Sequence, residues 1–258
     1  MGLFLNLGWD RNSRYVYCGD KSDYLFYYNL YSDGLCVFLP ITCPLFSYIN
    51  MKIYTGQTTG EKLEKIKELE LGIMISSNPN TAPSKVFSEV PCALDNGAFV
   101  CYSKGYGFQS DVFLETLRKC YKLGISLDFI VCPDIICGGL DSLSFSIKWA
   151  NGKLFGYPRL ALVLQDGMGI KDIRHYHLTK FTHLFVGGSV EWKWKTAKDW
   201  IQFAHDNNKE CHIGQCGKLE YLEQALRLGA DSVDSTSITR NDSWHIIEQF
   251  NNKLRLEL

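Results

Sequence analysis

The chain has 258 residues, of which 46% are hydrophobic and 21% are charged, and its 27 basic residues nearly balance its 28 acidic ones. A chain of this length and apolar content can bury one large core, so we expect one large domain rather than two small ones. The balanced charge excludes a protein that binds polyanions through a large positive net charge, although a local basic patch can still hold nucleic acid.

The first fifty residues differ from the rest because they are rich in Tyr and Phe. The apolar run at residues 34–49 is too short and too interrupted by proline to span a bilayer, and no basic leader with a small-residue cleavage site precedes it. We therefore expect no membrane partner. A regular pattern begins at Met51. We expect residues 1–50 to be an N-terminal extension, or translated sequence upstream of a true start at Met51, and residues 51–258 to form the folded domain.

The ten cysteines are scattered through apparent strands and helices without a CxxC pair or a Cys/His tetrad. This distribution is typical of free buried thiols in a reducing cytoplasm. Cys211, His212 and Cys216 lie close enough in sequence to suggest metal ligands. Because adjacent residues on a strand point to opposite faces, we expect no metal there.

From Met51 on, short apolar runs alternate with stretches whose apolar residues are three and four apart, as in helices. The apolar runs lack strict alternation, which is typical of parallel strands buried on both faces. The eight predicted strands are residues 52–56, 72–76, 92–97, 128–135, 160–165, 183–188, 211–215 and 231–236. No GxGxxG follows the first strand. The series predicts a compact α/β protein, a (β/α)8 TIM barrel, rather than an open doubly wound sheet.

Polar residues and glycines stand at the carboxyl ends of these strands, where barrels hold their active sites. In chain order they are Asp95, Asp134, Gln165, Gly187, Gly188, Gln215 and Asp234. Each carboxylate taken alone could equally cap a helix or close a turn, and the glycine pair could be a tight turn. Three carboxylates at one mouth favour a catalytic site.

The motifs at these ends resemble those of the tRNA-guanine transglycosylases and of their shorter relatives that exchange guanine for a 7-deazaguanine in DNA. LDNGAF at residues 94–99 resembles the family's D-S-G-G-[FY] element, and CPDI at 132–135 its guanine-reading aspartate. LVLQDG at 162–167 is similar to V-Q-G-G, and LFVGGSVEW at 184–192 to V-G-G-L. The segment 212–236 is similar to the family's G-V-G-x-P-x-D-L…G-x-D-x-x-D segment.

The resemblance implies that Asp234 is the nucleophile and Asp95 the general acid/base. Base exchange requires such a pair because the glycosidic bond breaks through an oxocarbenium-like transition state, whose carbon a carboxylate can capture covalently. A second carboxyl group must move protons on the departing and arriving bases.

The resemblance also implies which residues contact the base: Asp134, Gln165, Gly187 and Gly188. A carboxylate matches the N1–H and amino donors of guanine, while an amide or a backbone N–H matches its carbonyl oxygen. An aromatic side chain is expected to stack on the base, and the candidates are Phe99, Tyr102 and Tyr106.

The chain departs from the tRNA-acting enzymes in several motifs. No cysteine follows Asp234, so their Cys-x-Cys-x-x-Cys…His zinc element is absent. Glu191 is out of register with the family's G-E ending, and the P-T-R element is reduced to STSITR. These departures favour the DNA-acting relatives of phages and modification islands. The resemblance then implies that the partners are DNA, rather than tRNA, and a free 7-deazaguanine base, and that no cofactor is needed. It also implies that the protein acts in the cytoplasm of a bacterial, archaeal or phage-infected cell.

A second motif, EWKWK, follows the glycine pair and interleaves aromatic and basic side chains. Its Trp192, Lys193 and Lys195, with Arg240 on the same face, are the predicted contacts to nucleic acid. The alternative is an ordinary amphipathic helix start. A base inside a duplex would also have to be flipped or presented in a single strand.

The sequence thus predicts a DNA guanine transglycosylase that inserts a base such as 7-cyano-7-deazaguanine by double displacement. Three alternatives remain. They are a tRNA-guanine transglycosylase, a nucleic-acid-binding barrel subunit without catalysis, and an unrelated barrel that binds a phosphorylated metabolite near Gly214 and Gly217.

Overall fold

The computed structural model describes residues 15–19, 25–29, 39–40, 51–173 and 175–257. The chain divides into two compact units, Met1–Asn50 and Met51–Leu258. In the first unit, β1 (Tyr15–Gly19), β2 (Leu25–Asn29) and β3 (Leu39–Pro40) pair as an antiparallel sheet in that order. Apart from β3, the apolar run of residues 34–49 lies outside the described residues.

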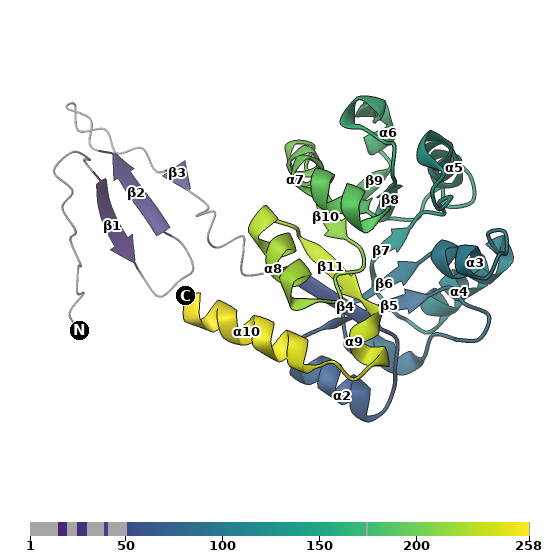
Figure 1. Ribbon diagram of the computed structural model, residues 1–258, viewed down its shortest axis with the longest axis horizontal. Coiled ribbons are helices and arrows are strands. Elements are labelled where there is room, and N and C mark those ends of the chain that lie inside the picture. The colour runs from purple at the N-terminus through teal and green to yellow at the C-terminus, as the bar shows by residue number, and fades with distance from the viewer. Residues whose placement is uncertain (1–14, 20–24, 30–38, 41–50, 174, 258) are drawn as a thin grey trace. The chain divides into compact units, whose positions relative to one another are not determined.

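The second unit alternates strands and helices from Met51 on (Figure 1). Its strands are β4 (Lys52–Gly56), β5 (Gly72–Ser76), β6 (Cys92–Asp95), β7 (Leu127–Val131), β8 (Leu160–Leu164), β9 (Phe181–Val186), β10 (Glu210–Ile213) and β11 (Ser232–Ser235). Its α-helices are α2 (Glu61–Glu68), α3 (Ala98–Ser103), α4 (Ser110–Lys122), α5 (Gly139–Asn151), α6 (His175–Leu178), α7 (Val190–Asp206), α8 (Leu219–Leu228), α9 (Thr236–Arg240) and α10 (His245–Glu257). Short 3-10 helices span Lys85–Glu89 and Ile170–Asp172.

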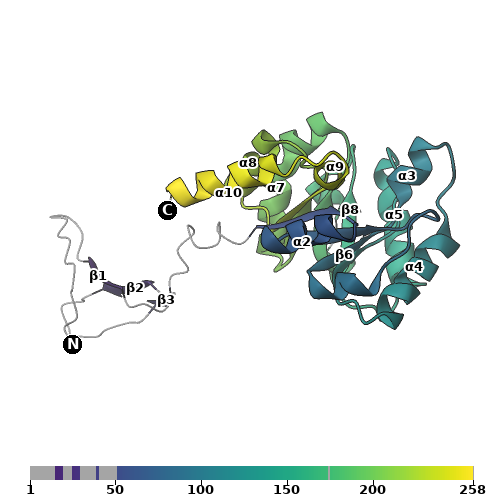
Figure 2. The ribbon, with the colours of Figure 1, turned by 90° about the horizontal axis from the view of Figure 1, so that it is seen from below.

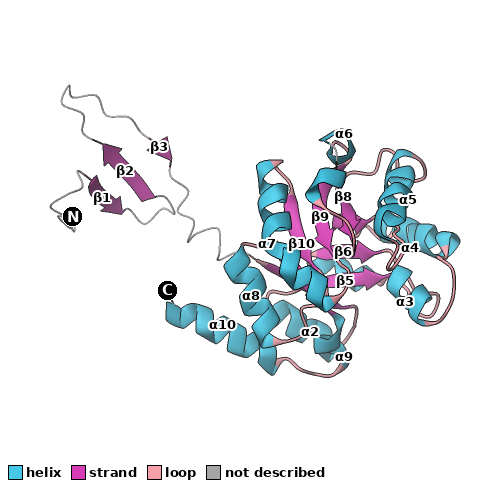
Figure 3. Ribbon diagram, turned by 45° about the horizontal axis from the view of Figure 1, so that its top comes forward, coloured by secondary structure: helices cyan, strands magenta, loops and turns pink. Residues whose placement is uncertain are grey.

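The eight strands form a closed barrel in chain order, and every neighbouring pair is parallel. The ring closes where β11 pairs with β4, with Asp234 opposite Tyr54. Figure 3 shows the strands inside a surround of helices, and the view from below in Figure 2 shows the same enclosure. The predicted (β/α)8 TIM barrel is therefore confirmed.

Buried side chains form two layers, as strands with two apolar faces require. One layer fills the lumen of the barrel and includes Tyr54, Met74, Phe129 and Val163. The larger layer lies between the strands and the surrounding helices, where α8, for example, buries Leu222 and Ala225. This packing fixes the strands rigidly, so the side chains at their carboxyl ends are held in defined positions.

The strands end earlier than the sequence predicts at several carboxyl ends. The largest difference is at β7, which ends at Val131 rather than Ile135. Pro133 explains this, because proline has no N–H to donate to a neighbouring strand. Asp134 therefore lies in the loop that follows β7 and not on the strand itself.

None of the described helices is both long enough and apolar enough to cross a membrane.

Candidate active site

Three carboxyl groups gather at the carboxyl end of the barrel. Asp95 is the last residue of β6, Asp134 lies in the loop after β7, and Asp234 is the third residue of β11. The charges of Asp234 and Asp134 both raise the pKa of Asp95, which places both groups within electrostatic reach of Asp95. The sequence predicted these residues at one mouth, and the structure brings them together.

Asp234 is buried and is held by donors from β10 and the turn after it. Its Oδ1 accepts a hydrogen bond from the Gln215 backbone N–H at 3.2 Å and lies 3.1 Å from His212 Nε2. The other imidazole nitrogen, Nδ1, lies 2.8 Å from the Ser232 hydroxyl. Burial lowers the pKa of His212, so the ring is neutral at pH 7. A carboxylate can only accept, so Nε2 carries the proton and Nδ1 accepts from Ser232.

Sequence reasoning considered His212 only as a metal ligand. In the structure it lies in the barrel lumen, and its ring centroid is 4.5 Å from that of Phe185 and 5.2 Å from that of Phe129. The missed signal was the parallel pairing of β10 with β11, which places His212 beside Ser232. In this register the His212 side chain, one position before the end of β10, can reach the Asp234 carboxylate on β11.

Asp95 has a pKa of about 7, well above the ordinary value of 3.8. Burial of the carboxyl group is the largest cause, followed by the charges of Asp234 and Asp134. The Gly97 backbone N–H, which donates to Oδ2 at 3.2 Å, acts in the opposite direction. The Ser77 hydroxyl fixes the strand end by donating to the Asp95 carbonyl at 2.7 Å. A carboxyl group with such a pKa can both give and take a proton near neutral pH.

Asp134 is buried and receives two side-chain amides. Asn96 Nδ2 donates to Oδ1 at 2.7 Å, and Gln165 Nε2 donates to Oδ2. Burial raises the pKa of Asp134 to about 6, while these two hydrogen bonds lower it. Gln165 Oε1 accepts from the Cys137 backbone N–H at 3.2 Å. Both ends of the Gln165 amide are thus used within the protein, so Gln165 positions Asp134. Its predicted contact to a base stays a prediction.

The glycine pair forms a close-packed turn after β9. The Gly187 N–H donates to the Leu164 carbonyl at 3.0 Å, so it does not face a ligand. Gly188 has a positive φ of 71°, and a Cβ there would lie 2.4 Å from the Asp166 carboxylate. Asp166 accepts hydrogen bonds from the Ser189 N–H and hydroxyl. The sequence offered close backbone packing as the alternative to a base contact for this glycine pair. Close packing explains why both positions 187 and 188 hold glycine.

The predicted nucleic-acid motif is the first turn of α7, capped by Ser189. Lys193 is only 1% exposed and donates from Nζ to the Gly214 carbonyl, so the predicted phosphate contact is wrong for this residue. Trp192 is partly buried, with its ring centroid 6.4 Å from that of Trp200. Lys195 and Arg240 are exposed. The helical period explains the difference, because Lys193 lies on the same buried face of α7 as Ala197 and Trp200, four and seven residues later.

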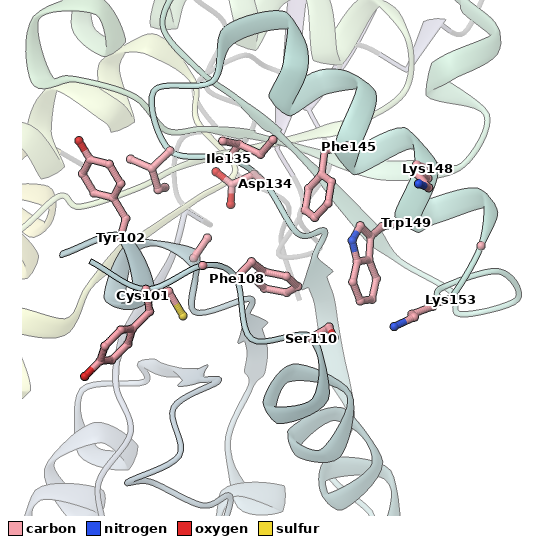
Figure 4. A pocket seen from close by; sticks show the side chains of 15 residues that line it. Cys101, Tyr102, Phe108, Ser110, Asp134, Ile135, Phe145, Lys148, Trp149 and Lys153 are labelled. Carbon is pink, nitrogen blue, oxygen red and sulfur yellow. The ribbon is translucent and has the colours of Figure 1, made fainter. Parts of the chain in front are cut away.

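A cavity of about 720 Å³ opens beside Asp134, between α5 and residues 98–110 (Figure 4). Tyr102 and Tyr106 line it, and Phe99 does not. Phe99 is 54% exposed on α3, so the two tyrosines are the better placed of the three aromatic candidates predicted for base stacking.

Among the described residues, no group of three or more His, Cys, Asp or Glu side chains could hold a metal ion. Both nitrogens of His212 are hydrogen-bonded to Ser232 and Asp234, and Cys211 and Cys216 are buried.

A scan against protein-family models and a search of the curated proteins both find no match to this chain.

Proposed function

We propose that the protein is a DNA guanine transglycosylase, a pentosyltransferase that exchanges guanine for a 7-deazaguanine by double displacement. The observation that carries the proposal is the joint placement of Asp95, Asp134 and Asp234 at one barrel mouth, with the pKa of Asp95 near neutrality. A held carboxylate beside a carboxyl group that can exchange protons is what glycosyl transfer with a covalent intermediate requires. The resemblance of the strand-end motifs to guanine transglycosylases selects this reaction among those that a barrel can host.

In the first displacement, an Asp234 oxygen attacks C1′ of the target nucleotide. Oδ1 is engaged by His212 and the Gln215 N–H, so we assign the attack to Oδ2. The C1′–N9 bond breaks as the C1′–O bond forms, and the electron pair leaves with guanine. Asp95, in its protonated form, donates a proton to the departing base.

In the second displacement, ionised Asp95 takes the N9 proton of the incoming base, for which we propose 7-cyano-7-deazaguanine. N9 then attacks C1′ and Asp234 departs as a carboxylate. The two steps together retain the configuration at C1′. No redox or metal chemistry enters this scheme, and the incoming base is a co-substrate rather than a cofactor.

Asp134 is the residue that we propose reads the base. Its two oxygens are held by Asn96 and Gln165, which fixes the direction of the carboxylate. Each carboxylate oxygen can accept a further hydrogen bond, and guanine offers its N1–H and amino group. The target base reaches these groups only if it is flipped out of a duplex or presented in a single strand.

The test is the release of labelled guanine from DNA and from tRNA by the purified protein supplied with 7-cyano-7-deazaguanine. We expect release from DNA, and we expect Asp234→Ala to abolish it. Asp199→Asn, which removes an exposed carboxylate from the middle of α7, is the matched control and should keep full activity. Release from tRNA alone would move the proposal to the RNA-acting enzymes. Release from neither polymer would contradict it and favour a non-catalytic binding subunit.

A further inference from the structure

The cavity beside Asp134 has the features of a binding site for part of the nucleic-acid substrate, and this inference rests on the proposed function. We call this cavity the aromatic groove and define it by Tyr102, Tyr106, Phe108, Lys148, Trp149 and Lys153. We propose that the aromatic groove binds the single-stranded DNA segment next to the target nucleotide, with bases stacked on its tyrosines and a phosphate on its lysines.

The groove is continuous with the candidate active site. Asp134 is one of its lining residues, so a strand whose target base contacts Asp134 enters the groove directly. Figure 4 shows Phe145, Lys148 and Trp149 on the α5 side, facing Cys101 and Phe108 on the opposite side. Its volume of about 720 Å³ falls within the 300–1,000 Å³ of pockets that hold whole small-molecule ligands. One guanine fills only part of such a space, and the rest is available for a neighbouring nucleotide.

The walls offer aromatic faces to bases. Tyr102 is 56% exposed and Tyr106 is 59% exposed, although large apolar side chains usually pack away from solvent. Phe108 packs edge-on against Trp149 of α5, with ring centroids 5.5 Å apart, so the two sides of the groove are in contact at this point. Exposed aromatic rings such as the two tyrosines bind single-stranded nucleic acid by stacking, with little sequence preference.

The groove also carries positive charge. Lys148 and Lys153 are both exposed and both line the cavity. Lys153 Nζ lies 5.0 Å from the centroid of the Trp149 ring, so a phosphate bound there would lie beside an aromatic face. The tyrosines and the lysines of the groove thus offer the two kinds of contact that single-stranded nucleic acid makes, stacking of bases and binding of phosphates.

The strand in this groove must be single. In a duplex the faces of the bases are covered by their neighbours and cannot stack on protein side chains, whereas a single strand offers them freely. The groove therefore favours target guanines in single-stranded or locally opened DNA, which agrees with the need to expose the sugar carbon to Asp234.

The test measures binding of a labelled ten-nucleotide strand by fluorescence anisotropy over a range of salt concentrations, without an incoming base. Lys148→Ala/Lys153→Ala should weaken binding and reduce the slope of log K against log[salt] by about 1.4, because each lysine contributes about 0.7 on a single strand. Tyr106→Ala should weaken binding by about five- to a hundredfold and leave the slope unchanged.

The matched controls lie outside the groove. Lys180 is exposed and lies over the Phe155 ring at 4.9 Å, as Lys153 lies over Trp149. Tyr176 is 60% exposed, which matches Tyr106. Lys180→Ala and Tyr176→Ala should bind as the wild type does. Urea unfolding of each variant checks that these substitutions at exposed positions leave the fold intact.

Binding and exchange are scored separately, so the two proposals can fail independently. Groove-dependent binding without guanine exchange would keep the strand subsite and overturn the transglycosylase. Exchange with no loss of binding in the groove variants, or equal loss in the control variants, would overturn the subsite. A ribo-oligonucleotide that binds more tightly than the matching deoxy strand, through the same residues, would contradict DNA as its occupant.

Discussion

Replacement of Asp95 by asparagine should make the protein more stable at alkaline pH while removing activity. Asp95 has a pKa of about 7 in the folded protein against 3.8 as its ordinary value. A carboxyl group whose pKa is raised by folding stabilises the fold below its unfolded pKa, and this contribution is lost as the pH rises through the folded pKa. This contribution to stability is therefore lost between about pH 4 and pH 7.

The size of the effect follows from the two pKa values. Ionising Asp95 in the folded protein costs about 4 kcal/mol of folding free energy in total, at 1.36 kcal/mol per pKa unit. About 3 kcal/mol of this loss falls between pH 5 and pH 8. An asparagine side chain stays neutral, and its oxygen can still accept the Gly97 N–H that Asp95 Oδ2 accepts now. The Asp95→Asn variant therefore keeps the local geometry without the charge.

The assay is urea unfolding of wild type, Asp95→Asn and the exposed control Asp199→Asn at pH 5 and pH 8. Between these pH values, the free energy of unfolding should fall by about 3 kcal/mol more in the wild type than in Asp95→Asn. The control should follow the wild type. Equal pH dependence in the wild type and Asp95→Asn would show that the pKa of Asp95 is not raised by folding, because Asp95 would then ionise as easily in the folded protein as in the unfolded chain.

Three further predictions concern the residues around the carboxyl groups. His212→Leu should lower the rate of guanine release by about 10- to 100-fold, because Asp234 loses the donor that positions it. His212→Gln, whose amide can still donate, should recover part of the lost rate. Equal rates in the two variants would count against a positioning role for His212. Gln165→Ala should destabilise the fold by about 1–3 kcal/mol in urea unfolding, because it removes a buried hydrogen bond to Asp134. The loss of this hydrogen bond should also raise the pKa of Asp134. Unchanged stability would show that the Asp134–Gln165 contact is dispensable. The single-turnover rate of guanine release should fall as the pH rises through about 7, because Asp95 must be protonated to donate, and a rate that rises over this range would contradict its role as the acid.

The barrel could be read from the sequence because parallel strands buried on both faces leave short apolar runs. Each of the eight barrel strands overlaps a predicted one, and β4, β5 and the start of β6 match to the residue, whereas β1, β2 and β3 were not predicted. Strand ends were less certain because polar residues beyond the last pair look the same in a strand as in a loop. Asp134 is the example, since Pro133 ended the strand before it.

The candidate site was partly predictable. Asp95, Asp134 and Asp234 could be chosen because the carboxyl ends of successive barrel strands must meet. His212 could not be assigned, since its role depends on the register between β10 and β11. Lys193 was misread because a charged side chain in a helical motif usually faces solvent, whereas here it donates to the Gly214 carbonyl in the interior.

The aromatic groove lay beyond sequence reasoning altogether. Its two walls come from α5 and from residues 98–110, which are about forty residues apart in the chain. Only the packing of α5 against the barrel brings Lys148 and Trp149 into the same cavity as Tyr102 and Tyr106.

Asp234 can be tested as the nucleophile by a search for a covalent adduct between the protein and guanine-containing single-stranded DNA, analysed under denaturing conditions without an incoming base. We expect a protein–DNA adduct whose peptide map places the sugar on Asp234. The adduct should disappear in Asp234→Asn and on addition of excess free guanine. An adduct on another residue, or guanine exchange with no adduct and undiminished activity in Asp234→Asn, would contradict Asp234 as the nucleophile.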